Sequence, residues 1–186
     1  SQEQPVLAKS GDDLRIDWGH LYLAVAEDAG QVAVGGPSAT RDAFCAGIGL
    51  PADDDPRMPR AADDDRPLLA ARMHLGSVGA GTAERTALLA YDDLWSIEYF
   101  GEHLRPWWRR DGTDARALLA EAHRDSHSLR ERCGMFDDEL IADLTASGGA
   151  KYAALCALAY RQAVAGCKLV ADSRGMPLLW PKENFS

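Results

Sequence analysis

The chain has 186 residues, of which 46% are hydrophobic and 26% charged, a balance typical of folded globular proteins. This length can bury a core in one good-sized domain or two small ones. The formal net charge of -9 argues against nucleic acid and anionic membrane surfaces as partners. No stretch approaches the roughly 18 apolar residues of a membrane-spanning helix.

The first 91 residues are predicted to form a β-rich segment. Apolar and polar residues alternate over residues 14–18 and 20–26, which is typical of half-buried strands. A third short strand over residues 31–34 ends at the break Gly35-Gly36-Pro37. A short helix then runs to about Gly47, with Ser38 or Thr40 as its N-cap.

A long polar loop follows over residues 51–66 and carries the acidic runs 53–55 and 63–65. We interpret both runs as solvated, because neither has the alternating carboxylates, glycine and distant glutamate of an EF-hand calcium loop. Residues 67–75 and 84–91 are apolar and are joined by a glycine-rich stretch. This pattern predicts that the two segments pair as antiparallel strands. The glycine-rich joint lacks the Lys-Ser/Thr ending of a phosphate-binding loop.

The second half, residues 92–186, is predicted to be mainly helical. A first helix is expected over residues 94–108 and is ended by its proline. Thr113 or Asp114 caps a second helix that is expected to stop near Gly134. Two further helices are predicted over 136–145 and 150–171, followed by a short strand or extended segment over 176–180.

The cysteines and histidines indicate no metal and no cofactor. The chain has four cysteines and no CxxC motif. Cys156 and Cys167 are eleven residues apart in one predicted helix, a rise of roughly 16 Å, so they cannot pair with each other. Buried free thiols are the main interpretation, and a bridge from Cys133 to one of them is the alternative. His123 and His127 lack the glutamate of a helical zinc motif, so an exposed polar face is favoured.

The densest chemistry lies in residues 91–110, which combine carboxylates, aromatic side chains and arginines. Carboxylates beside aromatic walls bind polar substrates in many hydrolases. The same composition is typical of a junction between two domains, where aromatic residues pack and arginines pair with acids. Both interpretations stay open on the sequence alone.

Ordered motifs along the chain resemble a known family. They are Asp13-Leu14-Arg15-Ile16-Asp17-Trp18-Gly19-His20-Leu21-Tyr22-Leu23-Ala24, Asp55-Pro56-Arg57-Met58-Pro59-Arg60-Ala61, Leu89-Ala90-Tyr91-Asp92-Asp93, Ser96-Ile97-Glu98-Tyr99-Phe100-Gly101, Leu104-Arg105-Pro106-Trp107-Trp108-Arg109-Arg110, Lys151-Tyr152-Ala153 and Lys182-Glu183-Asn184-Phe185-Ser186. Together they resemble the glutaminase A group, in its six-helical-hairpin domain. The resemblance covers nearly the whole chain.

The resemblance implies an α+β fold for a piece of a larger secreted or periplasmic protein. Residues 1–91 would be a β-rich segment that ends a β-supersandwich. Residues 92–186 would be antiparallel helical hairpins of an (α/α) toroid-like domain that is incomplete in this chain. Characterised members of the family are glutaminases, which hydrolyse the side-chain amide of L-glutamine to glutamate and ammonia.

Candidate site residues follow from what amide hydrolysis needs, namely a base, an acid for the leaving ammonia and donors for the oxyanion. The candidate acids and bases are Asp92, Asp93, Glu98 and Glu183. The candidate substrate-binding residues are Tyr99, Trp107, Trp108, Arg109, Lys182 and Asn184. The expected partners are a small polar substrate, glutamine or a sugar, and the remaining domains of the parent chain. The alternatives are a glycoside hydrolase-like toroid and a non-catalytic packing module of a larger enzyme.

Overall fold

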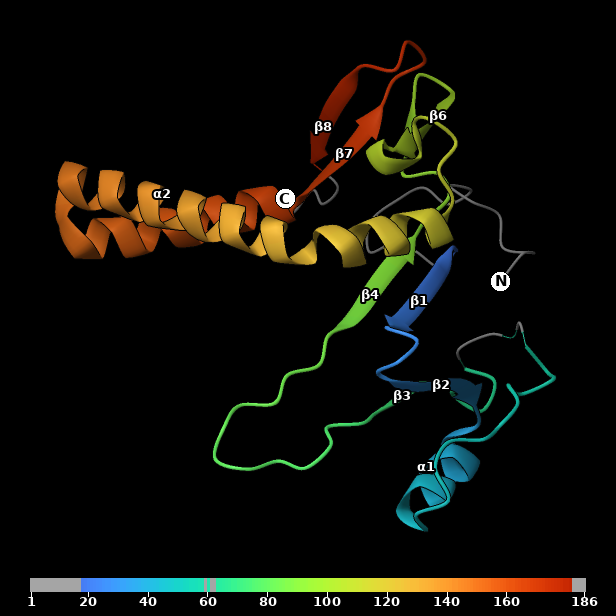
Figure 1. Cartoon of the computed structure of the whole chain (residues 1–186). Coiled ribbons are helices and arrows are strands. Elements are labelled where there is room, and N and C mark those ends of the chain that lie inside the picture. The colour runs from blue at the N-terminus through green and yellow to red at the C-terminus, as the bar shows by residue number, and fades with distance from the viewer. Residues whose placement is uncertain (1–17, 59, 61–62, 182–186) are drawn as a thin grey trace. The chain divides into compact units, whose positions relative to one another are not determined.

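The computed structural model describes residues 18–58, 60 and 63–181, so the strand expected over residues 14–18 lies almost wholly outside the described residues. The chain divides into two compact units, Ser1–Asp93 and Leu94–Ser186. The first unit runs from blue to green in Figure 1 and holds paired strands with one short helix. The second unit holds a sheet and a long helical element.

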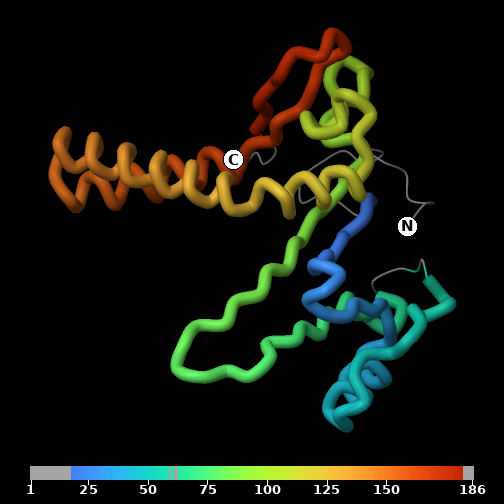
Figure 2. The backbone as a smooth tube through the Cα atoms, in the orientation of Figure 1, coloured from blue at the N-terminus to red at the C-terminus, as the bar shows by residue number. Residues whose placement is uncertain are grey.

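Unit 1 is a nested pair of antiparallel ribbons. Strand β1 (His20–Val25) pairs with β4 (Ala87–Asp92), and β2 (Gly30–Gly35) pairs with β3 (Leu68–Met73). The strands expected near residues 20–26 and 31–34 are therefore present. The expected pairing of 67–75 with 84–91 is wrong, because β3 and β4 each pair with an earlier strand. Residues 74–86, which include the glycine-rich stretch, form the long loop seen in green in Figure 2.

Helix α1 (Pro37–Cys45) begins earlier than the sequence predicted. Its N-cap is Gly36, and Pro37 occupies the first turn, where a fixed φ and a missing N–H cause no loss of hydrogen bonding. Neither Ser38 nor Thr40 caps the helix, and the N-cap Gly36 has no side chain that could bond to its first N–H groups. The preference of proline for the first helical position overrides the hydroxyl residues that follow it.

Unit 2 contains a four-stranded antiparallel sheet in the order β5-β6-β7-β8. Its strands are Ile97–Tyr99, Glu102–Pro106, Cys167–Ala171 and Pro177–Pro181. The helix expected over residues 94–108 is wrong. Phe100 and Gly101 both have positive φ, 49° and 78°, which makes a two-residue turn between β5 and β6. Leu104 and Pro106 are buried whereas His103 and Arg105 are exposed, which is the period of a strand, and a short 3-10 helix follows at Trp107–Arg109.

Element α2 (Ala115–Ala165) is two helical arms joined at Gly149. Asp114, one of the two expected caps, is the N-cap of the first arm. Its carboxylate accepts a hydrogen bond from the Ala117 N–H at 2.8 Å. The expected stop at Gly134 is wrong, since the helix continues through it. Gly149, with φ 79° and ψ 175°, turns the chain back. The rings of Phe136 and Tyr160, one from each arm, lie 5.8 Å apart, and Figure 1 shows the arms side by side.

The helix expected over residues 150–171 ends earlier in the structure, at Ala165, and its last expected residues form a strand. Gly166 caps the second arm, and the chain continues as strand β7 (Cys167–Ala171). Cys156 and Cys167 therefore do not share a helix. All four cysteines are free. Cys45 and Cys133 are exposed and Cys156 and Cys167 are half-buried, so the expectation of buried thiols is wrong.

The expected fold class is wrong. A toroid-like domain needs several antiparallel helical hairpins around an axis, whereas the described residues form three small sheets, the short helix α1 and the single long element α2. The segment expected to form the first helix contains β5 and β6 instead, and the end of the last expected helix forms β7. The physical reason is that short apolar segments fit both the helical and the strand period, and pairing with a neighbouring strand decides between them.

The described core is small. In unit 2 it centres on Val170, which is fully buried, with Leu104 and Ala171 beside it in the sheet. Both arms of α2 carry large apolar side chains that are exposed: Leu129, Met135, Phe136, Ile141, Tyr152, Leu155, Leu158, Tyr160 and Val164. None of the described helices is both long enough and apolar enough to cross a membrane.

Candidate functional site

Asp92 and Asp93, the first candidate acids, are deeply buried at the end of β4, with exposed fractions of 2% and 1%. In the ladder, Asp92 lies opposite His20 of β1. Gly19 allows this close approach, because a Cβ there would lie 2.4 Å from the Asp92 carbonyl oxygen. The Tyr91 hydroxyl donates to the carbonyl of Trp18 and ties the two strand ends together. Buried carboxylates are costly and therefore mark positions with a specific role in structure or chemistry.

Glu98, the third candidate acid, lies on β5 directly opposite His103 of β6. The distance from Glu98 Oε2 to His103 Nε2 is 3.9 Å, and both side chains are about half exposed. A carboxylate that faces an imidazole is a common arrangement for proton transfer. The β5–β6 turn creates this pair by placing residues 98 and 103 in register.

A cavity of about 260 Å³ lies beside this pair in unit 2. Its lining includes Trp95, His103, Arg105 and Arg110 from the strand region, together with Asp172 from the β7–β8 turn. The Arg105 guanidinium carbon lies 4.7 Å from the centre of the Trp95 ring, a cation–π contact. His103 and Arg105 were not selected from the sequence. Their signal was the alternation of exposed and buried residues along β6, which a helical interpretation of the segment concealed.

The other predicted residues of unit 2 occupy separate places. Tyr99 packs against Trp180 of β8, with ring centres 4.5 Å apart. Trp107 and Trp108 lie on the 3-10 helix and are covered by arginines, Arg110 at 4.2 Å from the Trp107 ring and Arg109 at 4.9 Å from the Trp108 ring. Lys182, Glu183 and Asn184 lie outside the described residues.

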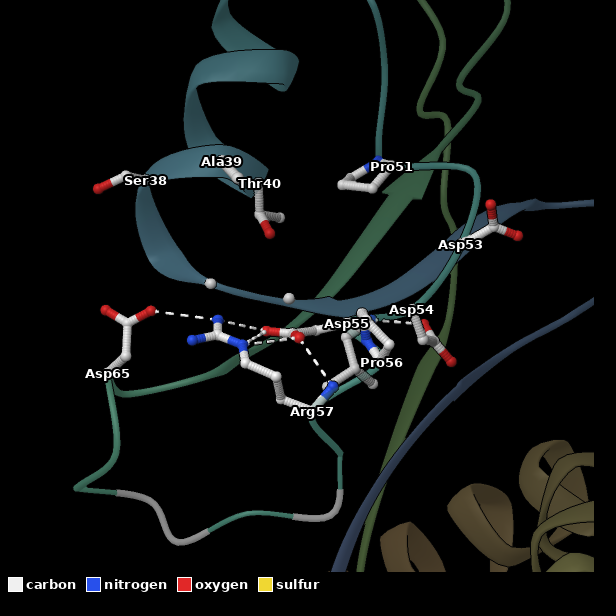
Figure 3. A pocket seen from close by; sticks show the side chains of 13 residues that line it. Ser38, Ala39, Thr40, Pro51, Asp53, Asp54, Asp55, Pro56, Arg57 and Asp65 are labelled. Atoms are coloured by element: carbon white, nitrogen blue, oxygen red, sulfur yellow. Dashed lines mark hydrogen bonds and ion pairs between the residues drawn. The ribbon is translucent and has the colours of Figure 1, made fainter.

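Unit 1 contains a larger cavity, of about 540 Å³, which is shown in Figure 3. The end of β2, the first turn of α1 and the acidic loop form its walls. The lining residues are Val34, Gly35, Gly36, Ser38, Ala39, Thr40, Pro51, Asp53, Asp54, Asp55, Pro56, Arg57 and Asp65. We call this cavity the acidic pocket. The sequence did not predict it, because the acidic runs were interpreted as solvated.

An ion-pair network holds the acidic loop in place. The Asp55 carboxylate accepts hydrogen bonds from the Arg57 side chain, the shortest at 2.6 Å from Nη2, and a further one at 3.1 Å from Nη2 of Arg60. The Arg57 side-chain and backbone hydrogen bonds, helped by the charges of both arginines, lower the pKa of Asp55 from 3.8 to about 2. The same contacts raise the pKa of Arg57. Asp54 attaches the loop to β2, because its Oδ1 accepts from the Val34 N–H at 2.8 Å.

The acidic pocket is not arranged as a metal site. No group of three or more His, Cys, Asp or Glu side chains in the described part of the chain could hold a metal ion. On α2, His127 lies 3.3 Å from Glu131 one helical turn later, and both side chains are exposed.

Comparison with known proteins identifies a family. A family model described as a domain of unknown function, DUF5127, matches residues 1–143, which include all of unit 1 and most of the first arm of α2. The match covers most of the chain. No curated protein and no solved structure matches the chain.

Proposed function

We propose that this chain, which belongs to the DUF5127 family, forms part of a glutaminase-type amidohydrolase that releases ammonia from L-glutamine. The carrying observation is the ordered series of motifs, from residue 13 to residue 186, that resembles the glutaminase A group. A location outside the cytoplasm, secreted or periplasmic, belongs to the same proposal.

The chemistry of unit 2 supports amide hydrolysis. Glu98 and His103 face each other at 3.9 Å, so one can accept a proton from water while the other donates one to the leaving ammonia. Arg105 lines the neighbouring cavity and can hold a substrate carboxylate through two parallel hydrogen bonds. The aromatic wall of the cavity is Trp95.

The exposed side chains of α2 support the statement that the chain is part of a larger protein. Soluble monomers rarely expose contiguous apolar patches of more than a few hundred Å². Leu155 is 66% exposed on the second arm and Met135 is 73% exposed on the first. Burial of such side chains against further protein would stabilise the hairpin, at about 25 cal/mol per Å² of apolar surface.

The test measures ammonia release from L-glutamine by the full-length protein that contains this chain. Glu98→Gln removes the carboxylate and should lower kcat at least about 100-fold, the usual contribution of a general acid or base. Glu131→Gln, the same change beside a histidine on α2, is the matched control and should leave kcat unchanged. Equal activity of the two variants would remove Glu98 from the mechanism. Hydrolysis of aryl glycosides without release of ammonia would replace the proposal with a glycosidase.

A second candidate function, a non-catalytic packing module, is favoured by the same exposed face of α2. To test this, the chain and the rest of the parent protein are expressed separately and mixed. The double variant Leu155→Ser/Leu158→Ser of this chain should then associate more weakly with the rest of the parent. Activity of the parent would then fall only through loss of the complex, and excess of this chain would restore it. If Glu98→Gln lowers kcat while the chain still associates fully with the rest of the parent protein, packing is not the only function of the chain.

A further inference from the structure

One arginine that lines the cavity of unit 2 is held in place without an acidic partner. Arg105 is an exposed residue of β6, and its guanidinium carbon lies 4.7 Å from the centre of the Trp95 ring. It forms no ion pair with any described residue. Contact with a ring restrains the guanidinium group but leaves its in-plane N–H donors available. These donors can therefore bind a ligand in the cavity.

Most of the other charged groups around this cavity are engaged in local contacts. Nε of Arg110 lies 3.2 Å from Oδ2 of its neighbour Asp111. Oδ1 of Asp172 accepts hydrogen bonds from two backbone N–H groups of the β7–β8 turn, at 2.9 and 2.7 Å. Glu102 also lines the cavity and, like Arg105, makes no ion pair with a described residue. The cavity thus offers a cation and an anion to a ligand, which suits the two charges of a free amino acid.

The strand register places Arg105 near the pair that can transfer protons. His103 and Arg105 are two positions apart on β6, so their side chains lie on the same face of the sheet, where Glu98 lies opposite His103. The Trp95 ring lies near both, with its centre 6.0 Å from that of the His103 ring. Residues two apart on a strand are separated by about 6.6 Å, so a ligand of a few carbon atoms can extend from one to the other.

We propose that Arg105 is the specificity-determining residue of this site and binds a free carboxylate at one end of the substrate. The amide at the other end then lies at Glu98 and His103. This role rests on the proposed function and defines its substrate class. A guanidinium group binds a carboxylate through two parallel hydrogen bonds, which neutral sugars cannot form. Glutamine within a peptide is rejected as well, because its α-carboxyl group is part of a peptide bond.

Binding is measured by titration calorimetry of the full-length protein with L-glutamate, which keeps the α-carboxylate and is not hydrolysed. L-glutamate should bind, and Arg105→Gln should weaken its binding about tenfold or more, the typical effect of losing hydrogen bonds between charged groups. Arg132→Gln, the same change at an exposed position on α2, is the matched control. It should change the affinity less than about twofold.

Specificity is measured by comparing L-glutamine with 4-aminobutanamide, which is L-glutamine without its α-carboxylate. Arg105→Gln should raise KM for L-glutamine about tenfold or more and change kcat little, because this contact is the same in the ground state and the transition state. It should leave kcat/KM for 4-aminobutanamide unchanged. Arg105→Lys keeps the charge but not the planar fork, so it should restore only part of the preference for L-glutamine. Equal losses for both amides would overturn the role of Arg105 in specificity.

The binding and activity measurements fail separately. If the protein releases ammonia from L-glutamine but the Arg105→Gln and Arg132→Gln variants bind L-glutamate equally well, Arg105 is not the carboxylate site and the proposed function stands. If the protein releases no ammonia but binds L-glutamate in a way that Arg105→Gln weakens, the carboxylate site stands and the proposed reaction is wrong. If the unchanged protein does not bind L-glutamate, the role of Arg105 is overturned.

Discussion

The two units of the chain are stabilised by different interactions. Unit 1 is ordered by strand pairing and by charge: Arg57 and Arg60 hold Asp55, and Asp54 attaches the acidic loop to β2. Unit 2 is ordered around the buried apolar side chain of Val170 and by contacts between tilted aromatic rings, as between Tyr99 and Trp180. The acidic pocket occurs where charge orders a loop, and the Glu98–His103 pair occurs where a regular hairpin fixes the register of two strands.

Unit 2 also contains a contrast within itself. Its sheet buries Val170, Leu104 and Ala171, whereas α2 buries only two alanines, Ala115 and Ala153, among its described side chains. The hairpin is therefore expected to open at a lower free energy than the sheet, because it has few buried apolar contacts. The segment that forms α2 is therefore helical along its length although few of its side chains are buried against other parts of the described chain.

The largest expected effect tests the core of the unit 2 sheet. Val170→Ala removes two fully buried methyl groups and should lower the free energy of unfolding of unit 2 by roughly 2–3 kcal/mol. Leu169→Ala, on the neighbouring residue, which is 43% exposed, is the control and should cost less than about 1 kcal/mol. Denaturant melts would measure both, and similar losses would show that the sheet does not provide the core.

A somewhat smaller effect is expected at the turn of the helical hairpin. Gly149 has φ 79° and ψ 175°, a conformation available almost only to glycine, so Gly149→Ala should destabilise the hairpin by roughly 2 kcal/mol. Gly134→Ala lies inside the first arm with open space around its Cβ position and should stabilise it by about 0.5–1 kcal/mol. The measurement is amide hydrogen exchange along α2. Effects of the same sign would contradict a turn at Gly149.

The acidic loop of unit 1 should show a specific pH dependence. The pKa of Asp55 is lowered from 3.8 to about 2 in the folded chain, so its contribution to stability is complete above pH 4. This contribution is lost as the pH falls from about 4 to about 2, because the unfolded carboxyl binds a proton first. Asp55→Asn should remove the dependence, and Asp28→Asn, on an exposed turn, should keep it. Stability followed by NMR from pH 6 to pH 2 checks this sign.

The smallest effect is expected on the exposed face of α2. Leu155→Ser and Leu158→Ser should change the stability of the isolated chain by less than about 0.5 kcal/mol each, because both side chains are already exposed. Ala153→Leu would overpack one of the two buried alanines of α2 and should cost roughly 1–3 kcal/mol. Thermal melts compare the three variants. A large loss at Leu155 would show that the face is covered within this chain.

Several elements could be predicted from the sequence because their signals are local. Alternating residues predicted β1, the break at Gly35-Gly36-Pro37 ended β2 as predicted, and the cap at Asp114 began α2. The aromatic segment was misassigned, since residues 94–108 fit the helical period while Phe100 and Gly101 adopt a left-handed turn that only the pairing of β5 with β6 reveals. The continuous helix through Gly134 was missed for a similar reason: a glycine in a helix is tolerated when its neighbours continue the helix.

The candidate site was predictable only in part. Composition alone identified the segment with Glu98, but the partner His103 depends on strand register. The acidic pocket could not be predicted, because its walls come from β2, α1 and the acidic loop, and the Asp54–Val34 hydrogen bond that attaches the loop to β2 joins residues 20 positions apart.

The sequence by itself determined the charge of this protein, several of its strands, the helix cap at Asp114 and the residue types available for chemistry, because these depend on neighbours within a few positions. The tertiary structure decided which strands pair, where the long helical element turns and which charged side chains meet. Those outcomes depend on contacts between residues far apart in the chain, such as β1 with β4 and β7 with β8, whose free energies no local pattern contains.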